Sequence, residues 1–398
     1  MHTIVIVGGG YAGIHTAKAA KAESIRRGVP VRVVLLDQER THLKKVRLVQ
    51  AAAAPASLRV PWETLFPEGD VEFVHGRMVG VDGAARLVRY VDPGAPGGGE
   101  PQALAYDRLV LALGSVVRDA PAGAGGIALR DEAQAERIRL TAEANLAAAA
   151  AETDPARRAA LCAVVVAGGG ISGVETAAAL AKAMKRRAAA LGLPAALPRV
   201  TIVAGADRLV PLMSDAASRR LESRLRSIGV RVVRGVRVVR HDVESGATLS
   251  DGRRLPAGLV VWTIGVDPNP ALRSFGFPLD DSGRLLTDSS YRVRGGHDTI
   301  YAIGDNARVV DADTGIEDGM TCREAIAQAG RLGRVLLADL TGAPAEPHRA
   351  DTRQQYCVGL GEGEGFAWIR HWGVDFTIGG ALGGKVREYT WNYASFMK

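Results

Sequence analysis

Two glycine-rich segments of the same kind follow hydrophobic strand patterns 160 residues apart, counted from Gly8 to Gly168. The first reads IVIVGGGYAG over residues 4–13, and the second reads VVVAGGGISG over residues 164–173. Each pattern predicts a buried strand, a tight turn and the start of a helix. The glycines allow the backbone to approach a pyrophosphate, and the helix N-terminus offers free N–H groups to its oxygens. One such motif is weak evidence, but two in order predict two dinucleotides in one protein.

Length, composition and charge limit the remaining possibilities. The chain has 398 residues, of which 47% are hydrophobic and 23% charged, as expected for a globular protein with two or three domains. The net charge is +7, but no block of Lys and Arg is interleaved with aromatic residues, so we expect no nucleic-acid partner. Three cysteines argue against a disulfide framework, and no apolar run reaches the ~20 residues of a membrane span. The first predicted strand begins at Thr3, which leaves no room for a signal peptide. We therefore expect a cytoplasmic protein, with contact to a membrane surface as the less favoured alternative.

Hydrophobic patterns divide the chain into alternating strands and helices. Asp37 ends the second predicted strand, 24 residues after Gly13, where an acid is expected to bond a ribose hydroxyl; a surface aspartate at a strand end is the plainer alternative. The last 60 residues predict a small β-rich module with a terminal amphipathic helix. Elsewhere the patterns predict strands at 3–7, 31–36, 106–113, 164–167, 200–203, 259–264 and 301–303, and helices at 13–27, 129–151, 173–191 and 322–340.

Further motifs stand in a fixed order between and after the two glycine turns. They are LALG at 111–114, GVDPN at 265–269 and AIGD at 302–305. With the glycine turns, these segments resemble the flavoproteins with two dinucleotide-binding domains, the pyridine nucleotide-disulfide oxidoreductase superfamily. Within it, the chain looks most like the type II NADH dehydrogenases and the apoptosis-inducing-factor (AIF) type. The resemblance covers residues 2–340.

The resemblance implies an α/β fold with two Rossmann-like domains and a small C-terminal α+β module. The FAD-binding domain would be discontinuous, and the NAD(P)H-binding domain would be inserted into it. The implied ranges are 1–116 and 268–340 for the FAD-binding domain, 117–267 for the NAD(P)H-binding domain and 341–398 for the module.

The resemblance also assigns roles to residues of the FAD site. Gly8, Gly10 and Gly13 would hold the FAD pyrophosphate, Asp37 the adenosine ribose, and Asp305 the ribityl chain. The helix beginning near Cys322 would aim its N-terminus at the flavin ring, where its dipole stabilises negative charge. The remaining predicted cofactor contacts are Tyr11, Ala12, Gln38, Lys44, Ala112, Gly114, Gly265, Gly304 and Arg323.

In the second domain, the glycine turn would hold the pyrophosphate of NADH or NADPH, and Glu175 would lie near the nicotinamide and the flavin. There it could relay a proton or position the carboxamide; a first-turn acid that stabilises its helix is the plainer alternative. Because the second strand ends at Ala204 and Gly205 without an acid, the choice between NADH and NADPH stays open; Arg208 could meet a 2′-phosphate or pack on adenine. The residues of this turn are Gly168, Gly170, Ile171, Ser172 and Gly173.

The electron acceptor is less sharply indicated. The resemblance favours a quinone, but of the glutamines expected beside the flavin only Gln328 is present, since Arg323 and Ala327 stand at the other positions. We therefore treat Glu175 and Gln328 as the catalytic candidates of an FAD-dependent NAD(P)H oxidoreductase with a quinone-like acceptor. The alternatives are a reductase for a biosynthetic intermediate, a redox protein or sulfide, and an AIF-type redox-sensing binding protein.

Two further features bear on these alternatives. No cysteine pair follows the first glycine turn, which excludes disulfide reduction of the glutathione-reductase type, whereas a redox role for Cys322 and Cys357 stays open. No metal site is expected. The C-terminal helix carries an apolar stripe, which we expect to pack on its own domain or on a second copy in a homodimer rather than on lipid; the stripe is Val386, Tyr389, Tyr393 and Phe396.

Overall fold

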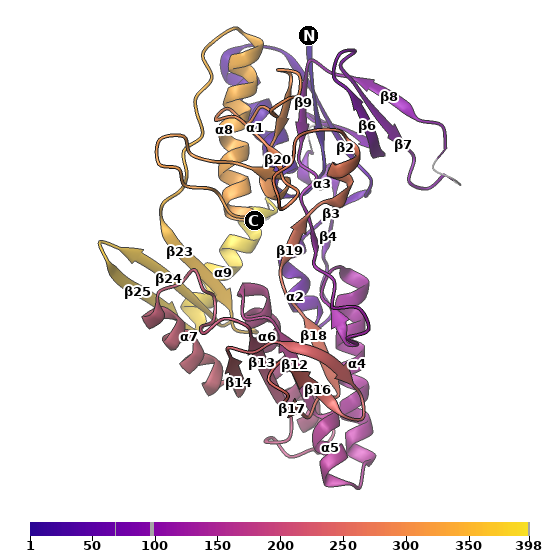
Figure 1. Ribbon diagram of the computed structural model, residues 1–398, viewed down its shortest axis with the longest axis vertical. Coiled ribbons are helices and arrows are strands. Elements are labelled where there is room, and N and C mark those ends of the chain that lie inside the picture. Colours follow the sequence, from indigo (N-terminus) through magenta and orange to yellow (C-terminus); the bar gives the residue numbers. More distant parts are fainter. Residues whose placement is uncertain (68, 96–98, 397–398) are drawn as a thin grey trace.

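The computed structural model describes residues 1–67, 69–95 and 99–396, so the last two residues of the predicted C-terminal module lie outside it. The upper half of the molecule in Figure 1 is built on a five-stranded parallel sheet in the order β21-β9-β1-β2-β5. Its strands are β1 (His2–Val7), β2 (Val31–Asp37), β5 (Glu72–His75), β9 (Arg108–Leu111) and β21 (Ile300–Ala302).

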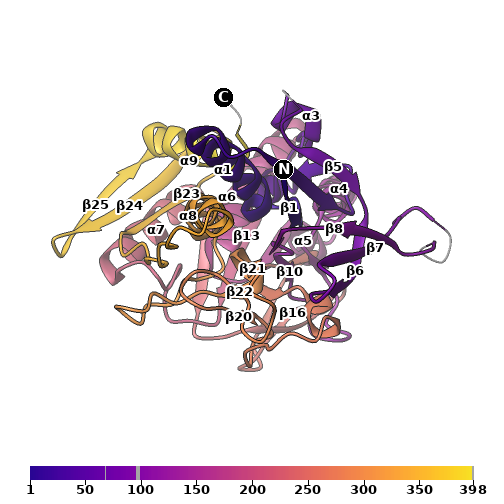
Figure 2. The ribbon, with the colours of Figure 1, turned by 90° about the horizontal axis from the view of Figure 1, so that it is seen from above.

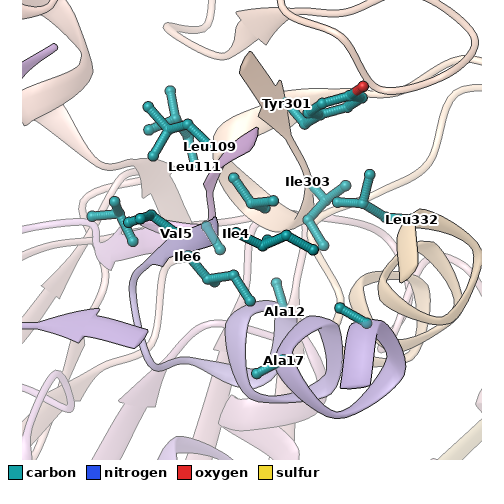
Figure 3. Close-up of a cluster of buried hydrophobic side chains, with 14 of the residues drawn as sticks. Ile4, Val5, Ile6, Ala12, Ala17, Leu109, Leu111, Tyr301, Ile303 and Leu332 are labelled. Atoms are coloured by element: carbon teal, nitrogen blue, oxygen red, sulfur yellow. The ribbon is translucent and has the colours of Figure 1, made fainter. Parts of the chain in front are cut away.

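The core of this half forms where β-branched and leucine side chains meet two helices. Ile4 and Ile6 of β1 are fully buried and point toward α1 (Tyr11–Arg27) and α8 (Cys322–Leu340), as Figure 3 shows, whereas Leu111 of β9 is buried on the other face of the sheet. The two helices touch backbone to backbone, because a Cβ at Gly333 would stand 2.7 Å from the Cβ of Ala19. Strands β1 and β21 share one sheet although they lie at opposite ends of the first 302 residues, as expected for a discontinuous domain.

The lower half in Figure 1 repeats the same plan with a parallel sheet in the order β11-β18-β12-β13-β14. Helices α5 and α7 were not predicted, because both are rich in charged residues and bury few apolar side chains. The strands are β11 (Ile127–Ala128), β12 (Ala163–Ala167), β13 (Arg199–Ala204), β14 (Val230–Arg234) and β18 (Leu259–Trp262), and the helices are α4 (Glu132–Ala151), α5 (Pro155–Leu161), α6 (Ile171–Ala190) and α7 (Asp215–Ser227).

The chain crosses between the two halves twice, through β10 (Ser115–Val117) and β19 (Val266–Pro268). These two segments pair antiparallel, so both crossings lie side by side. The bounds of the inserted domain at 116/117 and 267/268 fall within these two segments and stay a prediction.

Shorter strands and helices are attached to both halves. They comprise β3 (Thr41–Leu43) with β4 (Arg59–Pro61), the short helices α2 (Leu48–Ala51) and α3 (Trp62–Leu65), the meander β6 (Arg77–Asp82), β7 (Leu87–Val91) and β8 (Gln102–Ala105), the sheet β15 (Val238–Asp242), β16 (Gly246–Leu249) and β17 (Arg254–Leu255), and the pair β20 (Leu285–Leu286) and β22 (Ala307–Arg308).

The C-terminal module is a three-stranded antiparallel sheet followed by a helix: β23 (Gln354–Gly359), β24 (Gly365–His371), β25 (Val374–Gly379) and α9 (Gly380–Ala394). One face of the sheet buries Phe366 and Trp368 in the core of the lower half. Helix α9 lies on the other face and runs back to the upper half, where Figure 2 shows it beside α1. No helix among the described residues is long and apolar enough to cross a membrane.

Candidate functional site

The two glycine turns have the same geometry. Gly8 and Gly168 adopt φ angles of +105° and +136°, which side chains disfavour, and each N–H donates to the second strand of its sheet, at Leu36 O and Val203 O, both 2.9 Å away. A Cβ at Gly13 would stand 1.8 Å from Gly8 O, and one at Gly173 would stand 2.0 Å from Gly168 O. Glycine is therefore required at these positions by the close approach of helix and strand.

Gly10 and Gly170, the third glycine of each run, have open space at their side-chain position, as a bound phosphate requires. A Cβ at Gly10 or Gly170 would meet no atom within 4 Å. Each of these residues precedes a helix and offers no side chain to cap the first N–H groups. Open space in front of uncapped helix N-termini fits the pyrophosphates of FAD and of a nicotinamide dinucleotide, as both motifs predict. Tyr11 and Ala12 begin α1, and Ile171 and Ser172 begin α6.

Asp37 stands at the carboxyl end of β2, directly beside the first turn. Its Oδ2 atom accepts a hydrogen bond from the Gly9 N–H, and its Oδ1 atom accepts one from the Glu39 N–H at 2.7 Å. Burial raises the pKa of this carboxyl group, although both backbone hydrogen bonds oppose the rise. The side chain is thus fixed where a ribose hydroxyl would meet it. Gln38 follows and is exposed; its carbonyl oxygen lies 3.0 Å from His75 Nε2.

Asp305 lies in the turn after β21, opposite the end of β9. Ser115 Oγ donates to Asp305 Oδ2 at 2.6 Å, and Lys45 Nζ donates to Ser115 O at 2.9 Å. Burial lowers the pKa of Lys45, and the charge of Asp305 counteracts this. The basic residue next to the predicted ribityl site is therefore Lys45. Lys44, a predicted cofactor contact, lies near Arg47 and Glu388, and its contact with FAD stays a prediction.

Asn306, which follows β21, is hydrogen-bonded to the end of β9 and to the glycine turn after it. Its Oδ1 atom accepts from the Gly114 N–H at 3.2 Å, and its Nδ2 atom donates to Leu111 O at 3.1 Å. Gly114 has φ +65° with open space at its Cβ position, whereas the carbonyl of Ala112 stands against Gly8. Gly265 has φ +103° in the second crossing segment and accepts from the Arg118 N–H at 3.0 Å.

Gln328 has a supporting position rather than an exposed one. Its Oε1 atom accepts from the Gly304 N–H at 2.7 Å, and its Nε2 atom donates to Asp318 Oδ2 at 2.8 Å. The side chain is 2% exposed. Both polar atoms are engaged within the protein, so Gln328 holds the turn that carries Asp305, and a direct role in catalysis stays a prediction.

The first turn of α8 also differs from the expectation. Thr321 caps the helix by accepting from the Glu324 N–H at 3.3 Å, which occupies one of the free donors. The side chain of Arg323 turns away from the helix end: Nη1 donates to Arg353 O at 2.9 Å, and the guanidinium lies 5.8 Å from the ring of Tyr356. Arg323 therefore contacts the start of the C-terminal module, and its contact with a cofactor stays a prediction.

Glu175 forms a buried ion pair with a residue 212 positions further along the chain. Its carboxylate accepts from Arg387 Nε at 2.7 Å, from Arg387 Nη2 at 3.1 Å and from the Gly359 N–H at 2.6 Å. Glu175 is 3% exposed. Burial would lower the pKa of Arg387, but the charge of Glu175 and its hydrogen bonds outweigh burial and raise it. Sequence patterns gave no signal for Arg387.

A cavity of about 510 Å³ opens beside this ion pair. Its walls come from four places that are far apart in the sequence: α2 and the segment after it, α6, the connection between β23 and β24, and α9. The exposed lining is mostly apolar, with Trp391 as its aromatic residue, but it also includes charged side chains besides the Glu175–Arg387 pair. Such a cavity suits a partly apolar molecule with polar atoms.

The three cysteines are unpaired. Cys162 is fully buried directly before β12. Cys357 Sγ lies 3.4 Å from Thr390 Oγ1 and 3.7 Å from Arg387 Nη1, and burial raises the pKa of Cys322. A redox role for Cys322 and Cys357 stays a prediction.

Comparison with known proteins gives one family. The model described as pyridine nucleotide-disulphide oxidoreductase matches residues 2–329. The demethylphylloquinone reductase NdbB of Synechocystis is 26% identical over 360 residues, which are 87% of this chain and 81% of the relative. The type II NADH:quinone oxidoreductase Ndh of Mycobacterium tuberculosis is 27% identical over 379 residues, 87% of this chain and 74% of the relative. The solved structure of NDH2 from Plasmodium falciparum in complex with RYL-552 has the same fold, with a TM-score of 0.80 over 99% of this chain and 97% of that one, at 15% identity.

Proposed function

The chain belongs to the pyridine nucleotide-disulphide oxidoreductase family, and from this membership we propose that it oxidises NAD(P)H and passes the electrons to a quinone. It is an oxidoreductase with FAD as its cofactor and NADH as a co-substrate. The predicted alternatives of a non-enzymatic AIF-type sensor and of a reductase for other acceptors have no specific observation in their favour. The observation that carries the proposal is the buried Glu175–Arg387 pair, because it places a fixed carboxylate between the second glycine turn and the apolar cavity.

The residues of the proposed FAD site have separate roles in the reaction. FAD, when bound, supplies the ring that takes hydride from the nicotinamide and delivers electrons to the acceptor. The turn around Gly10 holds its pyrophosphate, while Asp37 and Asp305 accept hydrogen bonds from its sugar and ribityl hydroxyls. Lys45 places a positive charge beside Asp305, which favours the negative charge that reduction brings.

Glu175 is the residue we assign to the junction of the two cofactor sites. Three hydrogen bonds fix its carboxylate before a substrate binds, so binding requires little reorganisation of this side chain. The neighbouring Arg387 pairs with the carboxylate, and the cavity gives an acceptor access to it. We propose that this pair orients the acceptor and moves protons to it.

The test is to follow the absorbance of the bound flavin. The purified protein is expected to be yellow and to release FAD on acidification. Under anaerobic conditions NAD(P)H is expected to bleach the flavin, and a water-soluble quinone to restore its colour over many cycles. A colourless protein that cannot be reconstituted with FAD would contradict the proposal. So would inactivity with every quinone tried. A reduced state that persists for minutes with every acceptor would point to the AIF-type sensor.

We further propose a cytoplasmic homodimer that uses the exposed apolar surface of the C-terminal module. Trp372 at the tip of the β24–β25 hairpin is 89% exposed. Strand β25 is the edge of its sheet and leaves one row of backbone groups unpaired, which suits pairing with the same strand of a second copy. The other residues of this hairpin–helix surface are Ile369, Phe376, Ile378, Leu382, Tyr389 and Tyr393.

Sedimentation velocity tests the dimer. The wild-type protein is expected to sediment as a dimer, and a Phe376→Ser, Tyr389→Ser variant as a monomer with its FAD retained. Co-flotation of the wild type with anionic liposomes would assign the same surface to lipid instead. A monomeric wild-type protein that does not float would leave this surface without either partner and contradict the proposal.

A further inference from the structure

Within the second dinucleotide site, we infer that Arg237 recognises a phosphate on the adenosine ribose, so that the preferred co-substrate is NADPH. The inference rests on the proposed function, since it requires that the second glycine turn binds a nicotinamide dinucleotide. It concerns the end of β13, where the sequence alone left the choice between NADH and NADPH open.

The two halves of the chain can be aligned residue by residue at this point. Gly8 N–H donates to Leu36 O and Gly168 N–H donates to Val203 O, at the same distance of 2.9 Å. The residue after Leu36 is Asp37, so its counterpart after Val203 is Ala204. The surroundings of the next glycine agree with this alignment.

A Cβ at Gly9 would lie 3.1 Å from the Asp37 carboxylate, and a Cβ at Gly169 would lie 2.6 Å from the Ala204 methyl group. The NAD(P)H half therefore carries a methyl group where the FAD half carries a carboxylate. An acid at this position bonds the ribose 2′-hydroxyl and repels a 2′-phosphate. Ala204 removes that repulsion.

A positive charge takes the place of the missing acid. The side chain of Arg237 lies across Gly205, with Nε only 3.1 Å and Cγ 3.2 Å from the position of a Gly205 Cβ. Gly205 is the residue directly after β13, and Figure 1 shows β13 and β14 in the lower half of the molecule. A guanidinium above the strand tip is suited to bind a phosphate with two hydrogen bonds.

The backbone of Arg237 is fixed at this place. Its N–H donates to Ser250 Oγ at 3.1 Å, and its carbonyl oxygen accepts from the Ser250 N–H at 2.8 Å. Arg237 stands between β14 and β15, far from the turn where sequence patterns place a phosphate-binding arginine. Its role therefore had no sequence signal.

The neighbouring charges leave Arg237 as the available cation. Arg208, the residue considered from the sequence, pairs with Asp215 and donates to Pro211 O at 2.8 Å, so its guanidinium is already engaged. Arg234 pairs with Glu222. In the described part of the chain, Arg237 has no carboxylate within 4.0 Å, although the exposed Asp207 lies in the facing loop.

Equilibrium binding tests this inference without relying on turnover. Titrations of the FAD-loaded protein with NADP⁺ and NAD⁺, followed by isothermal calorimetry at low salt, are expected to give about tenfold or more tighter binding of NADP⁺. Arg237→Gln is expected to remove most of this preference by weakening NADP⁺ binding about tenfold, while NAD⁺ binding changes less than about twofold. Added salt is expected to weaken NADP⁺ binding in the wild type more than in the variant, because the contact is between exposed charges.

Two further variants sharpen the test. Arg231→Gln is the matched control, since Arg231 is also an exposed arginine but lies near the start of β14, away from the tip of β13. It is expected to leave both affinities unchanged. Ala204→Asp restores the carboxylate found at Asp37 and is expected to favour NAD⁺; because Ala204 is buried, FAD content reports whether this variant still folds.

The outcomes test the preference for NADPH and the binding of a dinucleotide separately. Equal loss of NAD⁺ and NADP⁺ affinity in Arg237→Gln would mean that the side chain packs on adenine, and it would overturn the inference. So would a wild-type protein that binds NAD⁺ as tightly as NADP⁺. Binding of neither dinucleotide to a folded, FAD-containing protein would overturn the proposed function as well.

Discussion

Gly10 and Gly170 are conspicuous among the motif glycines because nothing in the protein crowds them. At Gly8 and Gly13 a side chain would collide with backbone atoms, which explains those glycines by folding alone. At Gly10 folding gives no such reason. The space is kept free for something outside the chain, and the adjoining helix N-terminus favours an anion.

Gly10→Ala should therefore separate folding from binding. The added methyl group fits without contact, so the circular dichroism spectrum and the melting temperature of the apoprotein are expected to stay unchanged. FAD affinity is expected to fall about tenfold or more, or ~1.4 kcal/mol, because the methyl group occupies the approach of the pyrophosphate. Flavin fluorescence quenching measures it. Gly80→Ala, at an equally open position in β6, is the control; equal FAD affinity in both variants would argue against the assignment.

Glu175 gives the second prediction at this scale. Glu175→Gln is expected to slow flavin reduction or quinone turnover tenfold or more, about 1.4 kcal/mol in the barrier. It is also expected to lower stability by about 3 kcal/mol, since it leaves Arg387 buried without a partner charge. The simple alternative of a helix-end charge, worth under ~1 kcal/mol, no longer applies.

A double variant distinguishes a catalytic role of Glu175 from a purely structural one. Glu175→Gln with Arg387→Met removes both charges and is expected to regain most of the lost stability, while stopped-flow rates remain low. Recovery of the wild-type rates in the double variant would show that the pair only supports the fold.

Predictability from sequence differs between residues for a physical reason. Gly8, Gly13 and Asp37 were predictable because their environment is set by a strand, a turn and a helix that are adjacent in the chain. Arg387, Lys45 and Arg237 were not, because each acts on a residue brought near only by tertiary packing. The cofactor contacts of Lys44 and Arg323 stay predictions, and in this structure both side chains lie near other residues of the chain.

Helix α9 connects the C-terminal module to the first helix of the upper half. His15 on α1 contributes a hydrogen bond of 2.9 Å between its Nε2 atom and Ala394 O at the end of α9, and its ring lies 4.1 Å from that of Phe396. Thus Phe396 packs inside, whereas Tyr389 and Tyr393 of the same predicted stripe are exposed. The expected packing of the tail is confirmed for only part of the stripe.

This contact makes the stability dependent on pH. Burial lowers the pKa of His15 from 6.5 to about 4, and Lys18 and His42 add repulsion. Because the unfolded chain binds the proton first, stability is full above pH 6.5 and is lost as the pH falls toward 4, by about 3 kcal/mol in total. His15→Gln keeps an N–H donor but cannot titrate. Its melting temperature is expected to fall less between pH 7 and pH 5 than that of the wild type.

His42 remains in that variant, and burial lowers its pKa as well, so part of the pH dependence persists. His2→Gln, at an exposed position, is the control and should reproduce the wild-type curve. An identical pH dependence in His15→Gln and wild type would exclude His15 as its source.

Hydrophobic periodicity does not by itself separate the predicted helices from those that were missed. The helix predicted at 322–340 is α8 with the same bounds, and its buried face repeats with helical spacing. Helix α7 also buries Ala217, Leu221 and Leu225 at helical spacing, but it is short and rich in charged residues, and its start depends on the Ser214 cap that accepts from Ala217 N–H. A short cap signal of this kind is too common in sequences to identify a helix by itself.

At the scale of the whole molecule, the two dinucleotide-binding halves are joined by two crossings and by the C-terminal module. The crossings are the short ribbon of β10 and β19. The module adds a third link, since its sheet packs on the lower half while α9 reaches the upper half. Through Arg387, the same helix pairs with Glu175 of α6. The module therefore links the two halves of the molecule.

Deletion of residues 385–398 tests this integrating role. The truncated protein loses Arg387, the buried Trp391 and the contacts of Arg47 with Glu388 and Asn392. We expect its melting temperature to fall by roughly 5 °C or more and FAD to dissociate during gel filtration. The matched control is Tyr389→Ser with Tyr393→Ser, which alters only the exposed side of α9 and should keep stability and FAD. If the deletion instead preserved stability and FAD but abolished liposome flotation of the wild type, α9 would be an interfacial anchor. The ion pair between Glu175 and Arg387 makes that outcome the less expected one, because a helix that leaves for the membrane would leave the carboxylate unpaired.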